Sequence, residues 1–140
     1  MEREYKLAEQ YHLQGNNCIE SVIKTCNDTM NLQLPDVAIR MASGMGGGIG
    51  RSGCVCGALS GACLVIGALV GRRTPDEKPL PEVYKYTSEF HDRFKQHFGA
   101  TCCRPSIPSA SVRRNTASTA SRSRLPPPTW SPTSSPKKDC

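Results

Sequence analysis

The sequence lacks the short motifs of several common functional classes. It has no Cys-x-x-Cys or Cys-x-x-Cys-His motif and no ferredoxin-type cysteine spacing, which excludes a thioredoxin-like motif and c-type haem attachment. It has no GxxxxGK[ST] motif, so a phosphate-cradling P-loop is not predicted, and it has no internal repeat. Any iron–sulfur cluster would have to be assembled from distant segments.

Acidic residues and glycine are scarce near the C-terminus. Residues 105–140 contain one acidic residue against six lysines and arginines, with nine serines, seven prolines and no glycine. Such a composition cannot bury enough apolar surface to offset the entropy lost on ordering. We therefore predict a folded domain over residues 1–104 and a disordered tail over residues 105–140.

The folded part has no excess of charge of one sign. The chain carries a formal net charge of +6, but residues 1–104 hold twelve basic residues against eleven acidic ones, so nucleic acid is not an expected partner. Residues 1–6 lack the basic start and apolar run of a secretory signal, so a cytoplasmic location is expected. In a reducing compartment the eight cysteines are expected to be thiols, metal ligands or a redox pair rather than a disulfide framework.

Apolar residues recur at helical spacing in several segments, which predicts an all-α bundle of about five helices. Residues that favour helix starts and stops flank these segments. The clearest start is the capping-box pattern of Asn17 and Glu20, which places Cys18 at the first position of the second helix. The expected helices cover residues 2–13, 18–30, 36–42, 53–71 and 81–98.

Charge is missing from residues 53–71, which are rich in glycine, alanine and cysteine. A run of about 19 residues is long enough to span a bilayer, so a membrane-associated structural protein is one alternative. Leucine and phenylalanine are few, however, and the amphipathic helices elsewhere need a core on which to pack. We therefore predict a central buried helix without membrane insertion, along which Gly53, Gly57 and Gly61 allow a neighbouring helix to approach.

Six glycines fall within residues 44–53, which indicates a loop of unusual backbone geometry or one that a partner approaches closely. Residues 48–53 match the letters of a dinucleotide fingerprint, but they follow a predicted helix rather than a strand, so nucleotide binding is not expected. Contacts with a cofactor or small substrate would come from the central glycines, namely Gly46, Gly47, Gly48 and Gly50.

Three cysteine-bearing segments are predicted at helix ends, where the segments of a small bundle can converge. A cap at Ser52 would place Cys54 and Cys56 in the first turn of the central helix, where the dipole and the unpaired N–H groups favour a thiolate. Cys18 has the same position in the second helix. Cys103 lies beyond the end of the fifth helix and supplies the third segment.

The remaining cysteines are expected to be bystanders. Cys26 and Cys63 lie on apolar stripes, where a thiol commonly packs as a small hydrophobe. Cys102 is adjacent to Cys103, and the strain of an eight-membered ring argues against a bond between these two. The histidines are interpreted as ordinary surface or core-edge residues: His12, His91 and His97.

Several motifs together resemble one known family. They are Asn17-Cys18, the glycine-rich residues 42–51, Cys-Gly-Ala-Leu-Ser-Gly-Ala at residues 56–62, Phe-Lys to Phe-Gly at residues 94–99, and Cys103-Arg104. In this combination the chain resembles the C_GCAxxG_C_C family of redox-active proteins over most of residues 5–104. The resemblance implies a redox role for four cysteines, and Cys18, Cys56 and Cys103 match three of them.

The resemblance also implies a further cysteine and a closing helix after Arg104. Here the composition changes abruptly at Pro105 instead, and Cys140 lacks the context of the fourth family cysteine. An out-of-frame ending and a lineage-specific tail both fit this atypical C-terminus.

The leading hypothesis is a thiol-based redox protein or electron carrier that acts on a redox partner or small molecule. Cys56 would be the attacking thiolate, stabilised by Arg51 and the helix end, with Cys18 or Cys103 as its resolving partner. The alternative is a zinc- or iron–sulfur-binding protein in which Cys18, Cys56 and Cys103 are the ligands. The sequence leaves a homo-oligomer open.

Overall fold

The structure is a computed structural model that describes residues 2–77 and 80–103. Over these residues the chain is all-α, as predicted, and contains no β-strand, only an isolated β-bridge. The predicted tail, residues 105–140, lies outside the described residues. The helices are α1 (Glu2–Leu13), α2 (Cys18–Met30), α3 (Asp36–Ala42), α4 (Gly57–Val70) and α5 (Leu80–Phe98), with a 3-10 turn at Ser43–Met45.

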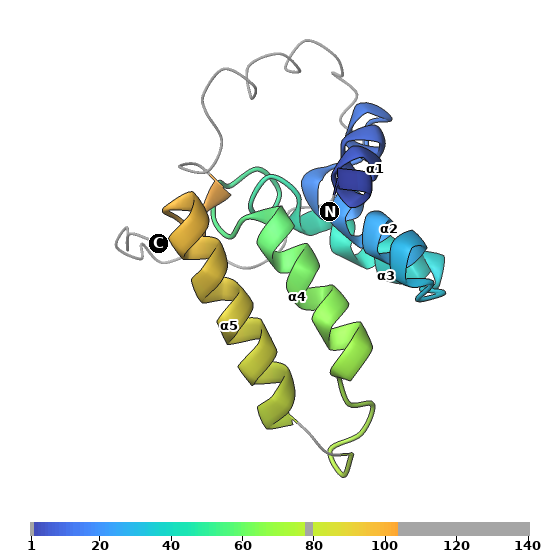
Figure 1. Cartoon of the computed structure of the whole chain (residues 1–140), viewed down its shortest axis with the longest axis vertical. Helices are drawn as coiled ribbons and strands as arrows, with labels where there is room; N and C mark the ends of the chain where they lie inside the picture. The colour runs from blue at the N-terminus through green and yellow to red at the C-terminus, as the bar shows by residue number, and fades with distance from the viewer. Residues whose placement is uncertain (1, 78–79, 104–140) are drawn as a thin grey trace, which may run out of the picture. The chain divides into compact units, whose positions relative to one another are not determined.

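The helices before the glycine segment begin and end where their capping residues predict. Gly15, with φ of 97°, follows the end of α1, and Asn17 caps the start of α2. Asn31 ends α2 in the left-handed conformation, with its N–H donating to the carbonyl of Asn27. In Figure 1, α1 to α3 gather on one side of α4.

Helix α4 packs against α2 because two of its positions carry no side chain. A Cβ on Gly61 would lie 3.1 Å from the Ile19 side chain and 3.3 Å from Val22, and Gly57 is closer still to α2. The predicted approach at Gly57 and Gly61 is therefore confirmed. Gly53 takes no part in this helix contact, because α4 begins only at Gly57.

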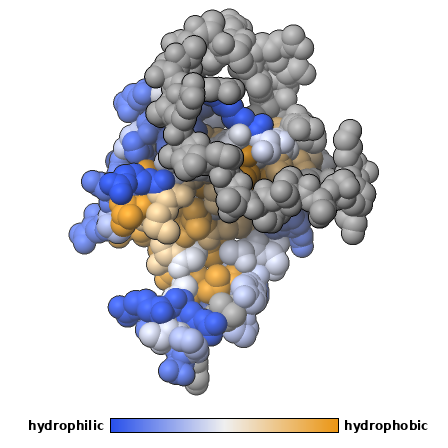
Figure 2. All heavy atoms as spheres, turned by 180° about the vertical axis from the view of Figure 1, so that it is seen from behind, coloured by the Kyte–Doolittle hydropathy of each residue, from blue (hydrophilic) through white to orange (hydrophobic). Residues whose placement is uncertain are grey.

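The core is small and centred on α2. Ile19, Ile23, Ala42 and Val65 form its buried cluster. Helix α4 is buried over its first half, as predicted, but in its second half Leu64 is 46% exposed and Leu69 52%. Figure 2 shows apolar residues, coloured orange, exposed on the face of the molecule that lies behind the view of Figure 1.

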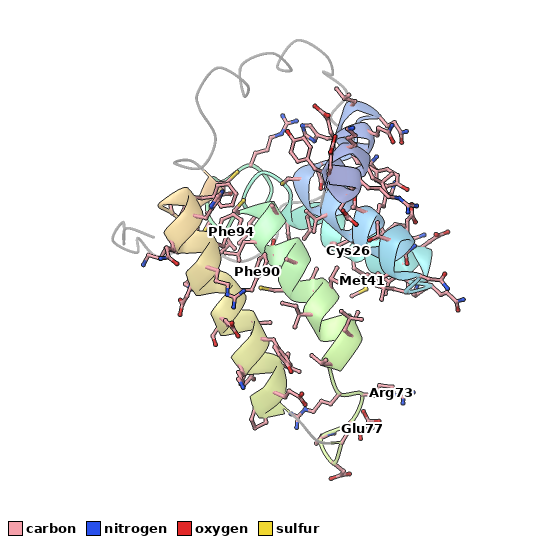
Figure 3. The ribbon with its side chains drawn as sticks, viewed as in Figure 1. Cys26, Met41, Arg73, Glu77, Phe90 and Phe94 are labelled. Carbon is pink, nitrogen blue, oxygen red and sulfur yellow. The ribbon has the colours of Figure 1, made fainter. Side chains whose placement is uncertain are left out.

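Helix α5 runs antiparallel to α4 and lies beside it (Figure 1). Phe90, Phe94 and Phe98 stack along it as their spacing predicts, with ring centroids 6.3 and 4.5 Å apart. Figure 3 shows Phe90 and Phe94 on the side of α5 that faces α4. Gly99, with φ of 76°, ends the helix as predicted, and the chain then turns back toward the start of α4.

A membrane-spanning role finds no support in the helices. Among the residues that the structure describes, none of the helices is both long and apolar enough to cross a bilayer.

Candidate functional site: a cluster of cysteines

The start of α2 holds the first cysteine in place. The Asn17 side chain accepts a hydrogen bond from the N–H of Glu20 (3.0 Å), and the Glu20 carboxylate accepts one from the N–H of Asn17 (2.9 Å). The predicted capping box is therefore confirmed. It makes Cys18 the first residue of α2, with a partly buried side chain.

The same capping residues hold the glycine segment. The Ser43 hydroxyl donates to the Glu20 carboxylate, and the Asn17 side-chain amide donates to the Ser43 carbonyl (3.1 Å). The hydrogen bond from Ser43 lowers the pKa of Glu20 and so favours the carboxylate that accepts it. A Cβ on Gly46 would come within 2.7 Å of the Asn17 amide nitrogen, so glycine is needed for this contact.

The glycine segment is a loop of left-handed backbone. Residues 47–51 all have φ between 58° and 73°, including Ile49 and Arg51, for which this conformation costs about 1–2 kcal/mol each. The N–H groups of residues 49–54 all donate to carbonyls of residues 44–49. Because these donors are used within the loop, they are not available to a bound anion in this conformation. Of the four glycines predicted to contact a cofactor, Gly46 and Gly50 donate their N–H groups to the carbonyls of Ser43 and Gly44, so cofactor contacts from the loop remain a prediction.

The segment before α4 pairs with the segment after α5. The N–H of Cys56 donates to the carbonyl of Thr101 (2.8 Å), and the N–H of Cys103 donates to the carbonyl of Cys54 (2.6 Å). These bonds flank the antiparallel bridge between Val55 and Cys102. Since alternate residues of an extended chain point to opposite faces, Cys54 and Cys56 share one face, and Cys103 lies opposite Cys54 where the second extended segment ends.

This pairing corrects the predicted start of the central helix. Cys56, with φ of −61° and ψ of 129°, is the N-cap of α4, so neither Cys54 nor Cys56 lies in its first turn and Ser52 is not its cap. The reason is long-range: residues 54–56 are extended because residues 101–103 pair with them.

Cys18 lies at the N-terminus of α4. A Cβ built on Gly57 would lie only 2.2 Å from the Cys18 sulfur, so the sulfur is in contact with the first residue of α4. The N-cap Cys56 makes no side-chain capping hydrogen bond. The sulfur of Cys18 thus lies beside the first residue of α4.

Cys103 completes the cluster. Burial raises the pKa of the Cys103 thiol, and the neighbouring thiols of Cys56 and Cys18 raise it further. Cys103 is 6% exposed and Cys56 8%, whereas Cys18 and Cys54 are only partly buried. Three cysteines that the sequence singled out, from three separate segments, are therefore neighbours in the fold, and none of the described cysteines is joined in a disulfide.

The cysteines expected to be bystanders lie elsewhere. Burial raises the pKa of the thiols of Cys26 and Cys63, and Cys26 packs against the core. Figure 3 shows Cys26 on α2, well beyond the start of the helix. Cys102, the bridge partner of Val55, is buried on the face opposite to Cys54 and Cys56.

The sequence placed Cys54 beside Cys56 but did not assign it to the reactive set. Cys54 was placed inside a helix, whereas the structure puts it directly opposite Cys103. The spacing Cys54-Val55-Cys56 is the available signal, since a two-residue period is typical of an extended segment with both thiols on one face.

Arg51 lies in the loop and is exposed. Its side chain packs against Gly47: a Cβ built on Gly47 would lie 3.0 Å from the Cγ of Arg51. Its stabilisation of a thiolate remains a prediction.

Metal binding by Cys18, Cys56 and Cys103 gains no support, because the described part of the chain contains no group of three or more cysteine, histidine or acidic side chains arranged to hold a metal ion.

A family model matches residues 16–126, most of the chain, and is described as "Putative redox-active protein (C_GCAxxG_C_C)". The chain belongs to this family. The family match thus confirms the resemblance, and it covers every cysteine of the cluster. It also extends beyond Arg104, where the sequence predicts the end of the folded domain. No curated protein and no solved structure matches the chain.

Proposed function

We propose that this member of the C_GCAxxG_C_C family is a thiol–disulfide redox protein whose reactive groups are Cys18, Cys56 and Cys103. The observation that carries the proposal is the convergence of three cysteines at the N-terminus of α4, from the start of α2, the residue before α4 and the segment after α5. Thiols gathered from three segments can react with one another, which a single buried cysteine cannot do.

The geometry favours Cys18 as the attacking thiol and Cys56 as the resolving one, which exchanges the roles expected from the sequence. Cys18 is the more accessible of the two, and its sulfur contacts the first residue of α4. Cys56 is nearly buried and adjoins Gly57, which the Cys18 sulfur contacts. Raised pKa values make an attacking thiol scarce as thiolate, so Cys103 is the weakest attacker of the cluster.

The reaction transfers two electrons from the protein to an organic disulfide. The Cys18 thiolate attacks one sulfur of the disulfide, forming a mixed disulfide and releasing the first thiolate, which takes up a proton. Cys56, after losing its proton, attacks the Cys18 sulfur. The bond between Cys18 and Cys56 forms, the second thiol leaves, and the two protein thiols have been oxidised.

The test is to trap the intermediate in full-length protein with a low-molecular-weight disulfide such as hydroxyethyl disulfide. In Cys56→Ser the mixed disulfide on Cys18 should accumulate and be visible as one added thiol by mass spectrometry, whereas the wild type should release it. Conversion of the adduct into a link between Cys18 and Cys103 would assign the resolving role to Cys103.

The matched control is Cys26→Ser, a cysteine of the same helix that packs in the core. It should behave as the wild type does. If the wild type forms no intramolecular disulfide, or if Cys26→Ser changes the outcome as much as Cys56→Ser, the redox assignment of this cluster is wrong.

A further inference from the structure

We infer that Cys54 and Cys103 form a second dithiol pair, which closes into a disulfide across the bridge beside the pair of Cys18 and Cys56. The inference rests on the proposed thiol redox function and gives a reactive role to Cys54, which is not among the proposed reactive cysteines Cys18, Cys56 and Cys103. It follows from the register of the two paired segments.

The register places Cys54 directly opposite Cys103. The hydrogen bond from the N–H of Cys103 to the carbonyl of Cys54 joins the two residues, one step along from the bridge pair. The Cα atoms of such directly opposed residues lie about 5.5 Å apart, within the range of about 4.4–6.8 Å that a disulfide spans.

The same register disfavours Cys56 as the partner of Cys103. Cys56 is opposite Thr101, to which its N–H donates, so it stands diagonally to Cys103. Diagonal neighbours in an antiparallel pair are about 7–8 Å apart, beyond the disulfide range. In an antiparallel pair of this register, a bond between Cys54 and Cys103 needs less backbone movement than one between Cys56 and Cys103.

The glycine loop covers this pair on one side. A Cβ on Gly48 would lie 2.6 Å from the backbone nitrogen of Cys54 and 2.8 Å from the Cβ of Cys103, so only glycine allows the loop to close here. Gly48 also accepts the N–H of Cys54 at its carbonyl (3.2 Å). The loop thus holds the two cysteines in register from outside the paired segments.

Accessibility sets the order of events. Cys54 is partly buried and Cys103 nearly completely buried, so Cys54 meets the organic disulfide first. The Cys54 thiolate attacks and forms a mixed disulfide, releasing one thiol. Cys103 then loses its proton and attacks the Cys54 sulfur, releasing the second thiol. The pair loses two electrons, and the organic disulfide is reduced to two thiols.

The experiment maps disulfides in the full chain after oxidation with hydroxyethyl disulfide and alkylation of the remaining thiols. Cys54 and Cys56 share the tryptic peptide of residues 52–72, so single variants must assign the link. The link from this peptide to the peptide that contains Cys103 should persist in Cys56→Ser and be lost in Cys54→Ser and Cys54→Ala. Cys102→Ser, altered on the opposite face of the bridge, is the control and should keep it.

Thermal unfolding followed by circular dichroism shows whether each variant is folded, and the two substitutions at Cys54 guard against a misfolded one. If the link survives in Cys54→Ser and disappears in Cys56→Ser, Cys103 pairs with Cys56 and the inference is overturned, while the proposed function stands. If no cysteine of the cluster forms an intramolecular disulfide, the inference and the proposed function fail together.

Discussion

Replacement of Gly57 by alanine would displace the Cys18 sulfur and little else. The new Cβ would lie 2.2 Å from this sulfur, whereas its next contacts, at 3.4 and 3.6 Å, are ordinary. Normal separations begin near 3.5 Å, so the sulfur must move by roughly 1.3 Å, or rotate about χ1 at a cost of about 0.5–1.5 kcal/mol. The lower backbone entropy of the unfolded alanine chain offsets about 0.4–1 kcal/mol of this cost. The free energy of unfolding should therefore change by less than about 1 kcal/mol.

The redox chemistry should change far more than the stability. A displacement of about 1 Å can slow a positioned reaction by about 10²-fold, so we expect closure of the bond between Cys18 and Cys56 to slow by about this factor in Gly57→Ala. The rate of bond closure is measured by quenching the reaction with acid at successive times and analysing the products by mass spectrometry. The matched control is Gly67→Ala in the same helix, where a Cβ meets nothing within 4 Å. Equal closure rates in Gly57→Ala and the wild type would refute the placement of Cys18 in the reaction.

Three further predictions follow from the loop and the thiols. Gly48→Ala should lower the free energy of unfolding by about 3 kcal/mol or more, because its Cβ meets backbone at a positive φ, whereas Gly50→Ala, with open space, should lose about 1–2 kcal/mol in urea titrations. Burial and two neighbouring thiols raise the pKa of the Cys103 thiol in the folded chain. As the pH rises, this thiol therefore loses its proton at a lower pH in the unfolded chain than in the folded one. The stability that Cys103 contributes should thus be intact below about pH 8.5 and fall as the pH rises above it, and Cys103→Ser should reduce the fall. Arg51→Gln should slow alkylation of the cluster roughly 2- to 5-fold at low salt, while Arg72→Gln, beyond the far end of α4, should not; equal rates in both would remove Arg51 from the site.

Helix bounds were predictable where local chemistry sets them. The capping box at Asn17 needs only residues within one turn, so the start of α2 and the position of Cys18 could be read from the sequence. The start of α4 depends instead on pairing with residues 101–103, far away in the chain. No local pattern reveals that partner, so a cap at Ser52 was the natural but incorrect expectation.

The gathering of cysteines from separate segments was predictable, but its geometry was not. Placement at segment ends indicated Cys18, Cys56 and Cys103, because ends of helices in a small bundle converge. Which sulfur lies against the end of α4 depends on a missing side chain at Gly57, and this contact between two helices has no signature in either segment alone. The position of Cys54 opposite Cys103 likewise depends on register, which the sequence does not set locally.

The most direct test of the central claim is the redox equilibrium of the full chain in glutathione buffers of graded ratio, quenched with acid and alkylated. We predict a two-electron transition in which Cys18 and Cys56 lose their thiols together within the same molecules and become linked to each other. Independent glutathione adducts on separate cysteines, or thiols that stay reduced at every ratio while the protein remains folded, would contradict it.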